Sequence, residues 1–475
     1  MLLRRKALSG FIWSLADKLI NQLGNLAVFI YLSKIIGPSG VGLVGLLFIF
    51  SVFAQSVVDS GFFQALVQKS TDITEEDLST IFYVNLLVSF FIYGCLFFLA
   101  PYLASFYHQP ELIDLSRIFF LIIIFNGLTI ASRAKLTIVV DFKSQMIANL
   151  VGTIIASIVA IIIVLNGYGY WSLAANIIVK ILVTNIVIWM YAKWLPKLIF
   201  SKKSFKSLFN FGSKLLIGSI VSIFVNNAHA MLIGRFYSIK DVGIYNQANT
   251  TTTSISSVFS STLQSVTFPI LTSIKNNQTE FIKVYKKLST LTLFISIPAF
   301  IGLISITTPL VKVFLGEEWI ALIPIFQIFC LNRLMTPIAI VNINILNAVG
   351  RSDLAMKLEF YKLPFTLGTL ILAIPFGVVA VAWAAFLSTF IAFFINTYYQ
   401  KKLFNFGAFE QIKISTKFFV AAIIMYLCNM LINLENSILE IFIKVILGIV
   451  IYITMLLVLK DRTIFMVKDL ILGQR

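Results

Sequence analysis

The stretch that decides the fold is QMIANLVGTIIASIVAIIIVL, residues 145–165, which contains no charged side chain. A helix of this length rises about 1.5 Å per residue and can cross the hydrocarbon core of a bilayer, which is about 30 Å thick. Apolar runs of similar length recur along the whole chain of 475 residues. The pattern therefore predicts a protein whose chain crosses a membrane many times.

The composition agrees with this prediction. The chain is 59% hydrophobic and only 12% charged, whereas about a quarter of the residues of a soluble domain are charged. Spans in lipid must satisfy their own backbone hydrogen bonds, and the alternating pattern of barrel strands is not seen in the sequence. The expected fold class is an all-α polytopic membrane protein.

Apolar runs bounded by charge, glycine or proline predict about fourteen transmembrane helices. The first is expected to remain as a span, because its apolar part is too long for a cleaved signal peptide. The predicted spans cover residues 10–36, 41–66, 79–106, 113–138, 145–165, 171–194, 209–235, 242–270, 286–310, 319–349, 354–375, 378–399, 415–433 and 438–459.

The distribution of lysine and arginine predicts the orientation. Of the 37 lysines and arginines, 26 fall in one alternating set of loops and 5 in the opposite set. Cytoplasmic loops are the ones enriched in these residues, so both termini are expected in the cytoplasm. The net charge of +17 is then explained by loops that meet anionic membrane lipids, and no nucleic-acid partner is expected.

The two halves of the chain resemble each other. Val41-Gly42-Leu43 recurs 201 residues later as Val242-Gly243-Ile244, and a basic linker lies between the halves. Duplication of a six-span unit gives two lobes in a parallel pseudo-twofold repeat, as in transporters that rock about a central site. The predicted domains are a six-helix lobe at 1–195, a basic cytoplasmic linker at 196–208, a second six-helix lobe at 209–402, and two additional helices with a cytoplasmic tail at 403–475.

Polar side chains recur at four-residue spacing on spans 1, 2, 7 and 8, which are equivalent in the two halves. Such spacing places them on one helix face. They could merely join helices by hydrogen bonds, but for these stripes we favour a water-filled cavity. The expected lining residues are Asn21, Asn25, Gln55, Gln64, Asn226, Asn249, Thr253 and Ser257.

Cationic side chains inside the spans outnumber acidic ones, which predicts an anionic ligand with phosphate oxygens. The alternative for each cation is that it reaches out to the membrane surface, as Lys34, Arg235 and Lys444 could do from positions near span ends. Spans 3 to 5 and 11 to 14 are mostly apolar and are expected to form an outer wall. The expected substrate-binding cations are Lys18, Lys180, Lys214, Arg333 and Lys362.

Motifs for covalent chemistry are not found in the sequence, which contains no phosphate-binding glycine loop, zinc-protease motif or catalytic triad. The three cysteines have no pair spacing and the two histidines are isolated, so neither a disulfide nor a metal site is expected. His229 lies within a span, where it could carry protons or form an interhelical hydrogen bond. We expect neither an enzyme nor a cofactor.

Several motifs along the chain carry a family resemblance. They include Gly37-Pro38-Ser39-Gly40-Val41-Gly42-Leu43, Thr74-Glu75-Glu76-Asp77-Leu78-Ser79-Thr80, Gly167-Tyr168-Gly169-Tyr170-Trp171-Ser172-Leu173, Leu232-Ile233-Gly234-Arg235-Phe236 and Leu315-Gly316-Glu317-Glu318-Trp319. From about Gly10 to Leu403 the chain resembles oligosaccharide flippases of the polysaccharide transport branch, of the Wzx and colanic-acid exporter type. That branch belongs to the multidrug/oligosaccharidyl-lipid/polysaccharide exporter superfamily.

The resemblance implies a flippase of the bacterial cytoplasmic membrane. It would move undecaprenyl-pyrophosphate-linked oligosaccharide repeat units of O-antigen, capsule or exopolysaccharide from the inner to the outer leaflet by alternating access. Polysaccharide polymerase and chain-length machinery are the implied protein partners. The resemblance also implies coupling to an ion, for which the candidate residues are Asp17, Asp59, His229 and Glu359. Family members often have an acidic residue where this chain has His229.

Two other functions fit a polytopic protein of this kind. A drug or metabolite exporter of the same superfamily would need an acid-rich cavity for cationic substrates, and the excess of cations argues against it. A membrane enzyme of polysaccharide assembly should have a large periplasmic or catalytic loop, and the predicted loops are short.

Overall fold

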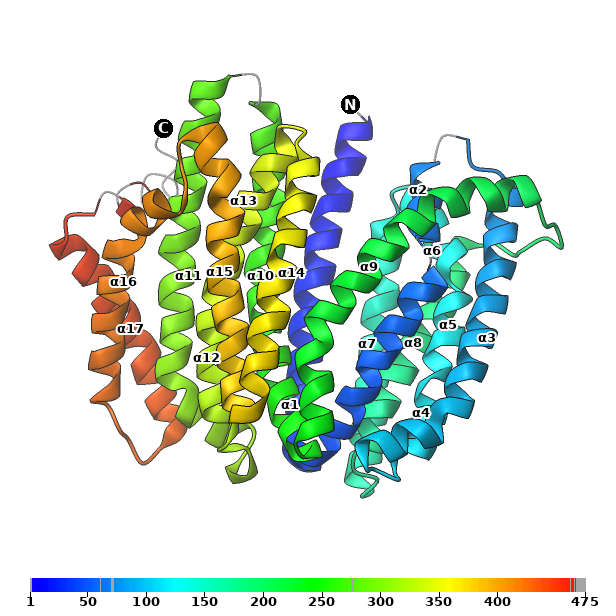
Figure 1. Cartoon of the computed structure of the whole chain (residues 1–475), viewed down its shortest axis with the longest axis horizontal. Helices are drawn as coiled ribbons and strands as arrows, with labels where there is room; N and C mark the ends of the chain where they lie inside the picture. Colours follow the sequence, from blue (N-terminus) through cyan, green and yellow to red (C-terminus); the bar gives the residue numbers. More distant parts are fainter. Residues whose placement is uncertain are drawn as a thin grey trace. The chain divides into compact units, whose positions relative to one another are not determined.

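The computed structural model describes residues 2–59, 61–69, 72–274, 277–461, 463, 464 and 466, without the side chains of residues 2–21 and of several positions between 211 and 273. Helices dominate the described residues, which contain no strand (Figure 1). Ten of these helices are long and apolar enough to cross a membrane, or eleven if one bent pair counts as a span. The all-helical polytopic class is confirmed, while the count of fourteen remains a prediction.

The first helix, α1 (Leu2–Asp59), covers the first predicted span and most of the second, whose end lies in the next helix. A straight helix of 58 residues would be about 87 Å long, far more than one crossing needs. The helix breaks at Gly37, whose φ of 77° and ψ of 172° favour glycine, and Pro38 follows with no N–H to donate. In Figure 1, α1 descends from the N-terminus and turns back at this kink.

The chain folds as two compact units, residues 1–246 and 247–475. In the first unit α7 packs against α8 and α1, and α9 packs against α1, α2 and α3. The predicted fourth span is broken, because Leu112–Gly127 and Ile130–Ile138 are bent by 41° relative to each other. The helices after α1 are α2 (Phe62–Gln68), α3 (Glu75–Tyr107), α4 (Leu112–Phe119), α5 (Leu121–Gly127), α6 (Ile130–Ile138), α7 (Phe142–Leu165), α8 (Trp171–Ala192), α9 (Lys202–Phe236) and α10 (Ile239–Ser273), which runs on into the second unit.

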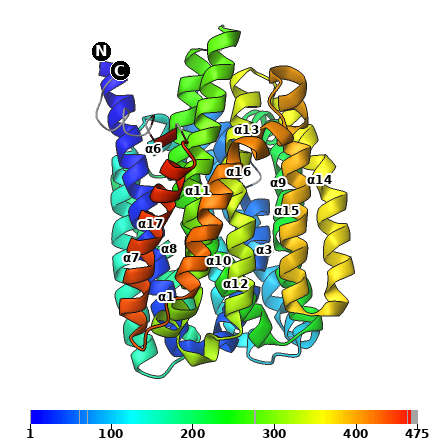
Figure 2. The ribbon, with the colours of Figure 1, turned by 90° about the vertical axis from the view of Figure 1, so that its left-hand side faces the viewer.

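The second unit is built around α11, which packs against α12, α16 and α17 (Figure 2). The predicted tenth span is two helices, α12 and α13, which meet at Met335. The two six-helix lobes and the terminal helix pair were inferred from an internal repeat in the sequence, and they stay predictions. The helices are α11 (Gln278–Phe314), α12 (Leu322–Leu334), α13 (Thr336–Ala348), α14 (Ser352–Ala373), α15 (Val378–Phe404), α16 (Ala408–Met430) and α17 (Ser437–Val458).

A buried polar network joins four helices of the second unit. The Tyr285 hydroxyl of α11 donates to Asn342 Oδ1 of α13 over 2.6 Å. Gln411 of α16 donates from Nε2 to the same oxygen over 3.0 Å, and Gln400 of α15 donates to the Asn342 carbonyl over 2.7 Å. All four residues are buried. In apolar surroundings such bonds favour a single register of the helices over others that would leave these groups unpaired.

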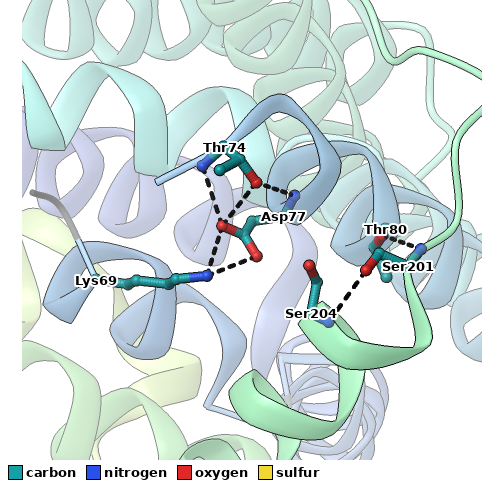
Figure 3. Close-up of polar contacts among 6 residues, drawn as sticks. All are labelled: Lys69, Thr74, Asp77, Thr80, Ser201 and Ser204. Carbon is teal, nitrogen blue, oxygen red and sulfur yellow. Dashed lines mark hydrogen bonds and ion pairs between the residues drawn. The ribbon is translucent and has the colours of Figure 1, made fainter. Parts of the chain in front are cut away.

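A second polar cluster holds the start of α3 (Figure 3). Asp77, which is fully buried, accepts from Lys69 Nζ over 2.8 and 2.9 Å and from the Thr74 N–H over 3.0 Å. Thr74 Oγ1 in turn accepts from the Asp77 N–H over 3.2 Å, which completes a capping box. One carboxylate therefore fixes both the end of α2 and the first turn of α3.

The segment between α8 and α9 is bound to this same end of α3. The Trp194 indole donates to Glu75 over 2.8 Å, the Lys197 N–H donates to Ser79 Oγ over 3.1 Å, and the Ser201 N–H donates to Thr80 Oγ1 over 3.0 Å. Helix α9 begins at Lys202, inside the predicted linker 196–208, because Ser201 caps its first turn. The linker is thus partly helical and is attached to the first unit.

Candidate functional site

The first unit contains a polar cavity of about 320 Å³ where α1 ends and α2 and α9 pass. Three of the predicted residues line it, namely Gln55, Asp59 and Gln64. Ser56 of α1 and Ser219 of α9 also line it, and their hydroxyl oxygens are 2.8 Å apart. Gln55 and Asp59, four residues apart on the second predicted span, thus line the same cavity.

Two groups in this cavity can interact with a ligand. Asp59 is half-buried, and the positive charge of Arg133 on α6 is close enough to interact with its carboxylate. The Gln55 side-chain oxygen is buried and, within the described part of the chain, has no hydrogen-bond partner. A buried acceptor without a partner is costly unless water or a ligand donates to it.

A cation and an amide from the predicted set meet between α8 and α1. Lys180 Nζ donates to Asn25 Oδ1 over 2.9 Å, and both side chains are half-buried. The two residues are 155 positions apart, so their contact is decided by packing and not by local sequence. The amide holds the ammonium of Lys180 inside the helix bundle without neutralising its charge.

The second unit brings together another cation and amide. Arg333, in the last turn of α12, donates from its guanidinium to Asn249 Oδ1 of α10 over 2.6 Å. Thr253, one turn further along α10, also donates to this oxygen over 3.4 Å. Arg333 is half-buried and Thr253 is exposed. Three predicted residues therefore form one polar cluster that carries a positive charge.

The remaining predicted residues of the second unit lie elsewhere. Lys362 Nζ forms an ion pair with Glu359 Oε1 over 2.6 Å on α14, and the Glu359 side chain is 65% exposed. The Ser257 hydroxyl donates to the Ser254 carbonyl within its own helix. The Lys362–Glu359 pair is locally neutral, so it is a weaker candidate for anion binding than Arg333.

His229 is buried on α9, where only 7% of its surface is exposed. Its Nε2 atom has no hydrogen-bond partner in the described part of the structure. An interhelical hydrogen bond from this nitrogen, one of the two alternatives for His229, is therefore not observed.

Five predicted residues have side chains outside the part of the structure that is described. They are Asp17, Lys18, Asn21, Lys214 and Asn226. Among the described residues, no group of three or more histidine, cysteine or acidic side chains could hold a metal ion.

One buried ion pair was missed by the sequence analysis. Lys444, one of the cations that could reach the membrane surface, is only 4% exposed and pairs with Glu440, which is 7% exposed. The ammonium of Lys444 reaches back one turn to Glu440, toward the start of α17. The spacing of four residues between an acid and a base on one helix was the available signal.

The fold is that of a class of helical membrane transporters. The lipid II flippase MurJ in an inward closed conformation aligns with a TM-score of 0.73 and 16% identity, over 96% of this chain and 100% of that one. An inward-facing multidrug resistance MATE family transporter of the MOP superfamily aligns with a TM-score of 0.60 and 15% identity, over 86% and 98%. Identities this low establish the shared fold alone.

Sequence comparison then identifies the family. Residues 31–324 match the family described as "Polysaccharide biosynthesis protein", and the chain belongs to it. The teichuronic acid biosynthesis protein TuaB of Bacillus subtilis is 26% identical over 378 residues, which is 76% of each chain. The lipopolysaccharide biosynthesis protein WzxC of Escherichia coli is 24% identical over 378 residues, 76% of this chain and 74% of that one. The resemblance inferred from the sequence motifs is confirmed.

Proposed function

We propose that this protein is a flippase that moves lipid-linked oligosaccharides across a membrane for polysaccharide assembly. The carried lipid would be undecaprenyl pyrophosphate, and the sugar would be a repeat unit of O-antigen, capsule or exopolysaccharide. The single observation that carries the proposal is family membership over residues 31–324, together with a flippase fold that extends over 96% of the chain.

The polar clusters of the two units supply the chemistry that such a substrate needs. A pyrophosphate requires cations held within the membrane, and Lys180 and Arg333 are both held there by amide oxygens. Guanidinium is especially suited to phosphate because its N–H groups match two oxygens at once. Sugar hydroxyls require hydrogen-bonding partners, which Gln55, Gln64 and Thr253 offer at partly exposed positions.

The mechanism follows from the proposed repeat. Two parallel six-helix lobes would rock about the substrate and open alternately to the two leaflets. Both termini would lie in the cytoplasm of a bacterium, and the substrate would enter from the inner leaflet. Asp59, with Arg133 beside it, is our first candidate for an ion-coupling residue, because it lines a cavity. Polymerase and chain-length proteins would act on the flipped product.

The alternative is export of a drug or metabolite by the same fold. The MATE transporter shares the fold, so the architecture by itself does not separate the two functions. The chemistry favours the flippase, since a cationic drug would be repelled by Lys180 and Arg333. A membrane enzyme is disfavoured because relatives such as the probable low-salt glycan biosynthesis flippase Agl15 of Haloferax volcanii are named as transporters.

Transport in reconstituted liposomes tests the proposal. A fluorescent lipid-linked oligosaccharide is placed in both leaflets, and the fraction that an impermeant quencher or lectin can reach is followed with time. The flippase should make the inner pool accessible, while a parallel assay with a cationic dye should show no transport. Dye transport without movement of the oligosaccharide by folded protein would replace this proposal with the exporter.

A further inference from the structure

A second polar cavity lies in the second unit, away from the residues proposed to bind the substrate. Its volume is about 460 Å³, and it is formed by α11, α12, α16 and α17 beside the segment that joins α16 to α17. Neither Arg333 nor Asn249 lines it. Among these helices α16 and α17 were expected to belong to an apolar outer wall, so a polar cavity beside them requires its own explanation.

The floor of the cavity is electrically neutral. Glu440 and Lys444 line it, both are almost fully buried, and they form an ion pair with each other. Next to this pair, Asn429 of α16 joins α11 and α17 by donating to Ser305 Oγ over 3.0 Å and to the Lys444 carbonyl over 3.2 Å. Because the buried charges cancel, the floor offers hydrogen-bonding groups without favouring a ligand of either sign.

The rim of the cavity carries one free charge of each sign. Lys312 lies on α11 near its C-terminal end, and Glu435 lies in the segment before α17. Both side chains are exposed, and neither has an ion-pair partner among the residues that the structure describes. Gln327, Asn433 and Ser437 add uncharged hydrogen-bonding groups. This lining is suited to a ligand that has an anionic and a cationic group.

The location indicates where such a ligand comes from. Helix α16 ends at Met430 and α17 begins at Ser437, and both are long and apolar enough to span a membrane. The segment between them therefore lies near the membrane surface, at the depth of lipid headgroups. The outer sides of both helices are apolar and exposed, with Leu427 55% and Phe442 65% exposed. A lipid lying against these helices could place its headgroup in the cavity.

We infer that this cavity binds the headgroup of a zwitterionic aminophospholipid such as phosphatidylethanolamine. Lys312 binds the phosphate, Glu435 accepts hydrogen bonds from the primary ammonium, and the amides and hydroxyls bind the glycerol and phosphate oxygens. The apolar side chains of Met430 and Leu434, which also line the cavity, contact the start of the acyl chains. This site does not depend on the identity of the transported substrate.

Native mass spectrometry of the full-length protein in mild detergent tests the inference. The protein is titrated with phosphatidylethanolamine, phosphatidylglycerol or phosphatidylcholine of identical acyl chains. Phosphatidylethanolamine should bind most tightly, because phosphatidylglycerol lacks a cation and the quaternary ammonium of phosphatidylcholine has no N–H to donate. Lys312→Gln and Glu435→Gln should each weaken its binding about tenfold or more, the effect of one charge-assisted hydrogen bond.

Both variants change exposed side chains, so the folded protein should survive the substitutions. Lys413→Gln, at the other end of α16, and Glu111→Gln, in the first unit, are matched controls that should leave the affinity unchanged. Equal affinity for the three lipids would overturn the inference. So would a preference for phosphatidylglycerol that Lys312→Gln removes and Glu435→Gln leaves intact, since that result identifies an anionic-lipid site.

Discussion

Gly42 and Gly243 face each other where the second half of α1 crosses the first turns of α10. A Cβ atom on Gly42 would overlap the carbonyl oxygen of Ile239, and one on Gly243 would overlap the carbonyl oxygen of Pro38. Pro38 lies four residues before Gly42, and Ile239 lies four residues before Gly243. The contact between the two helices is therefore reciprocal. The shift of 201 residues that relates the two sequence motifs also relates both pairs of contacts.

This crossing leads to the first prediction. Gly243→Ala should prevent the close approach of α1 and α10 and should destabilise this arrangement by about 1–3 kcal/mol, because a methyl group must displace backbone. Oligosaccharide transport in liposomes should fall at least severalfold. Gly94→Ala is the matched control, since a Cβ there meets no atom within 4 Å. Wild-type transport by Gly243→Ala would show that the crossing has no role in the transport cycle.

A second prediction concerns the cationic cluster of the second unit. Arg333→Ala should slow transport about tenfold or more, because one charge-assisted phosphate contact contributes about 1.5–3 kcal/mol. Arg333→Lys should retain an intermediate rate, since it keeps the charge and loses the two-pronged geometry. Transport rates at equal amounts of folded protein in the liposomes measure both effects. Arg351→Ala, at an exposed arginine outside the cluster, is the control, and equal rates for all three variants would contradict the assignment.

The buried network around Asn342 gives a third prediction. Tyr285→Phe removes the donor to Asn342 Oδ1, while Gln411 still donates to that oxygen. The substitution also removes the hydroxyl that accepts from Gln411 Nε2 over 3.1 Å. The loss should therefore be that of two hydrogen bonds, about 1–3 kcal/mol, and should lower Tm by several degrees. Tyr398→Phe, at a tyrosine that is 61% exposed, should leave Tm unchanged. Thermal unfolding followed by intrinsic fluorescence or circular dichroism can measure the difference, and identical shifts would refute the role of the network.

The fourth prediction concerns the polar cluster around Asp77 at the start of α3. Asp77→Asn should weaken the contact with Lys69 and the capping box, at a cost of about 1–2 kcal/mol. Because the segment from Trp194 to Ser201 is hydrogen-bonded to the same helix turn, the peptide bond after Lys197 should become more accessible to protease. Trypsin should cleave this segment faster in Asp77→Asn than in Glu76→Gln, whose carboxylate is exposed. Equal cleavage rates would show that the segment is held independently of Asp77.

Much of this fold could be predicted because each membrane span is recognisable from its own run of apolar residues. Apolar runs such as residues 145–165 must form complete helices in lipid, and α7 (Phe142–Leu165) matches that run closely. The breaks were harder to predict. The break at Gly37 is marked by Gly37-Pro38, but the bend before α6 and the junction at Met335 interrupt hydrophobic runs whose composition continues through them.

For the candidate site, the sequence predicted which polar residues lie inside the helix bundle better than it predicted which of them are in contact. Residues four apart on one span, such as Gln55 and Asp59, could be placed on one face by helical geometry alone. Arg333 and Asn249 are 84 residues apart, and nothing in local spacing pairs them. The same limit explains why the buried pair of Lys444 and Glu440 was not predicted, because its burial depends on the helices around it.

The sequence alone determined that the chain is a helical membrane protein of a polysaccharide-assembly family, because hydrophobic length and motif order are properties of the chain itself. The tertiary structure decided which polar groups meet. It joined Lys180 to Asn25 and Arg333 to Asn249, and it opened a polar cavity among helices whose sequences are mostly apolar. The physical reason is that lipid dictates where a span begins and ends, whereas the partner of a buried charge is dictated by the packing of helices that are distant in sequence.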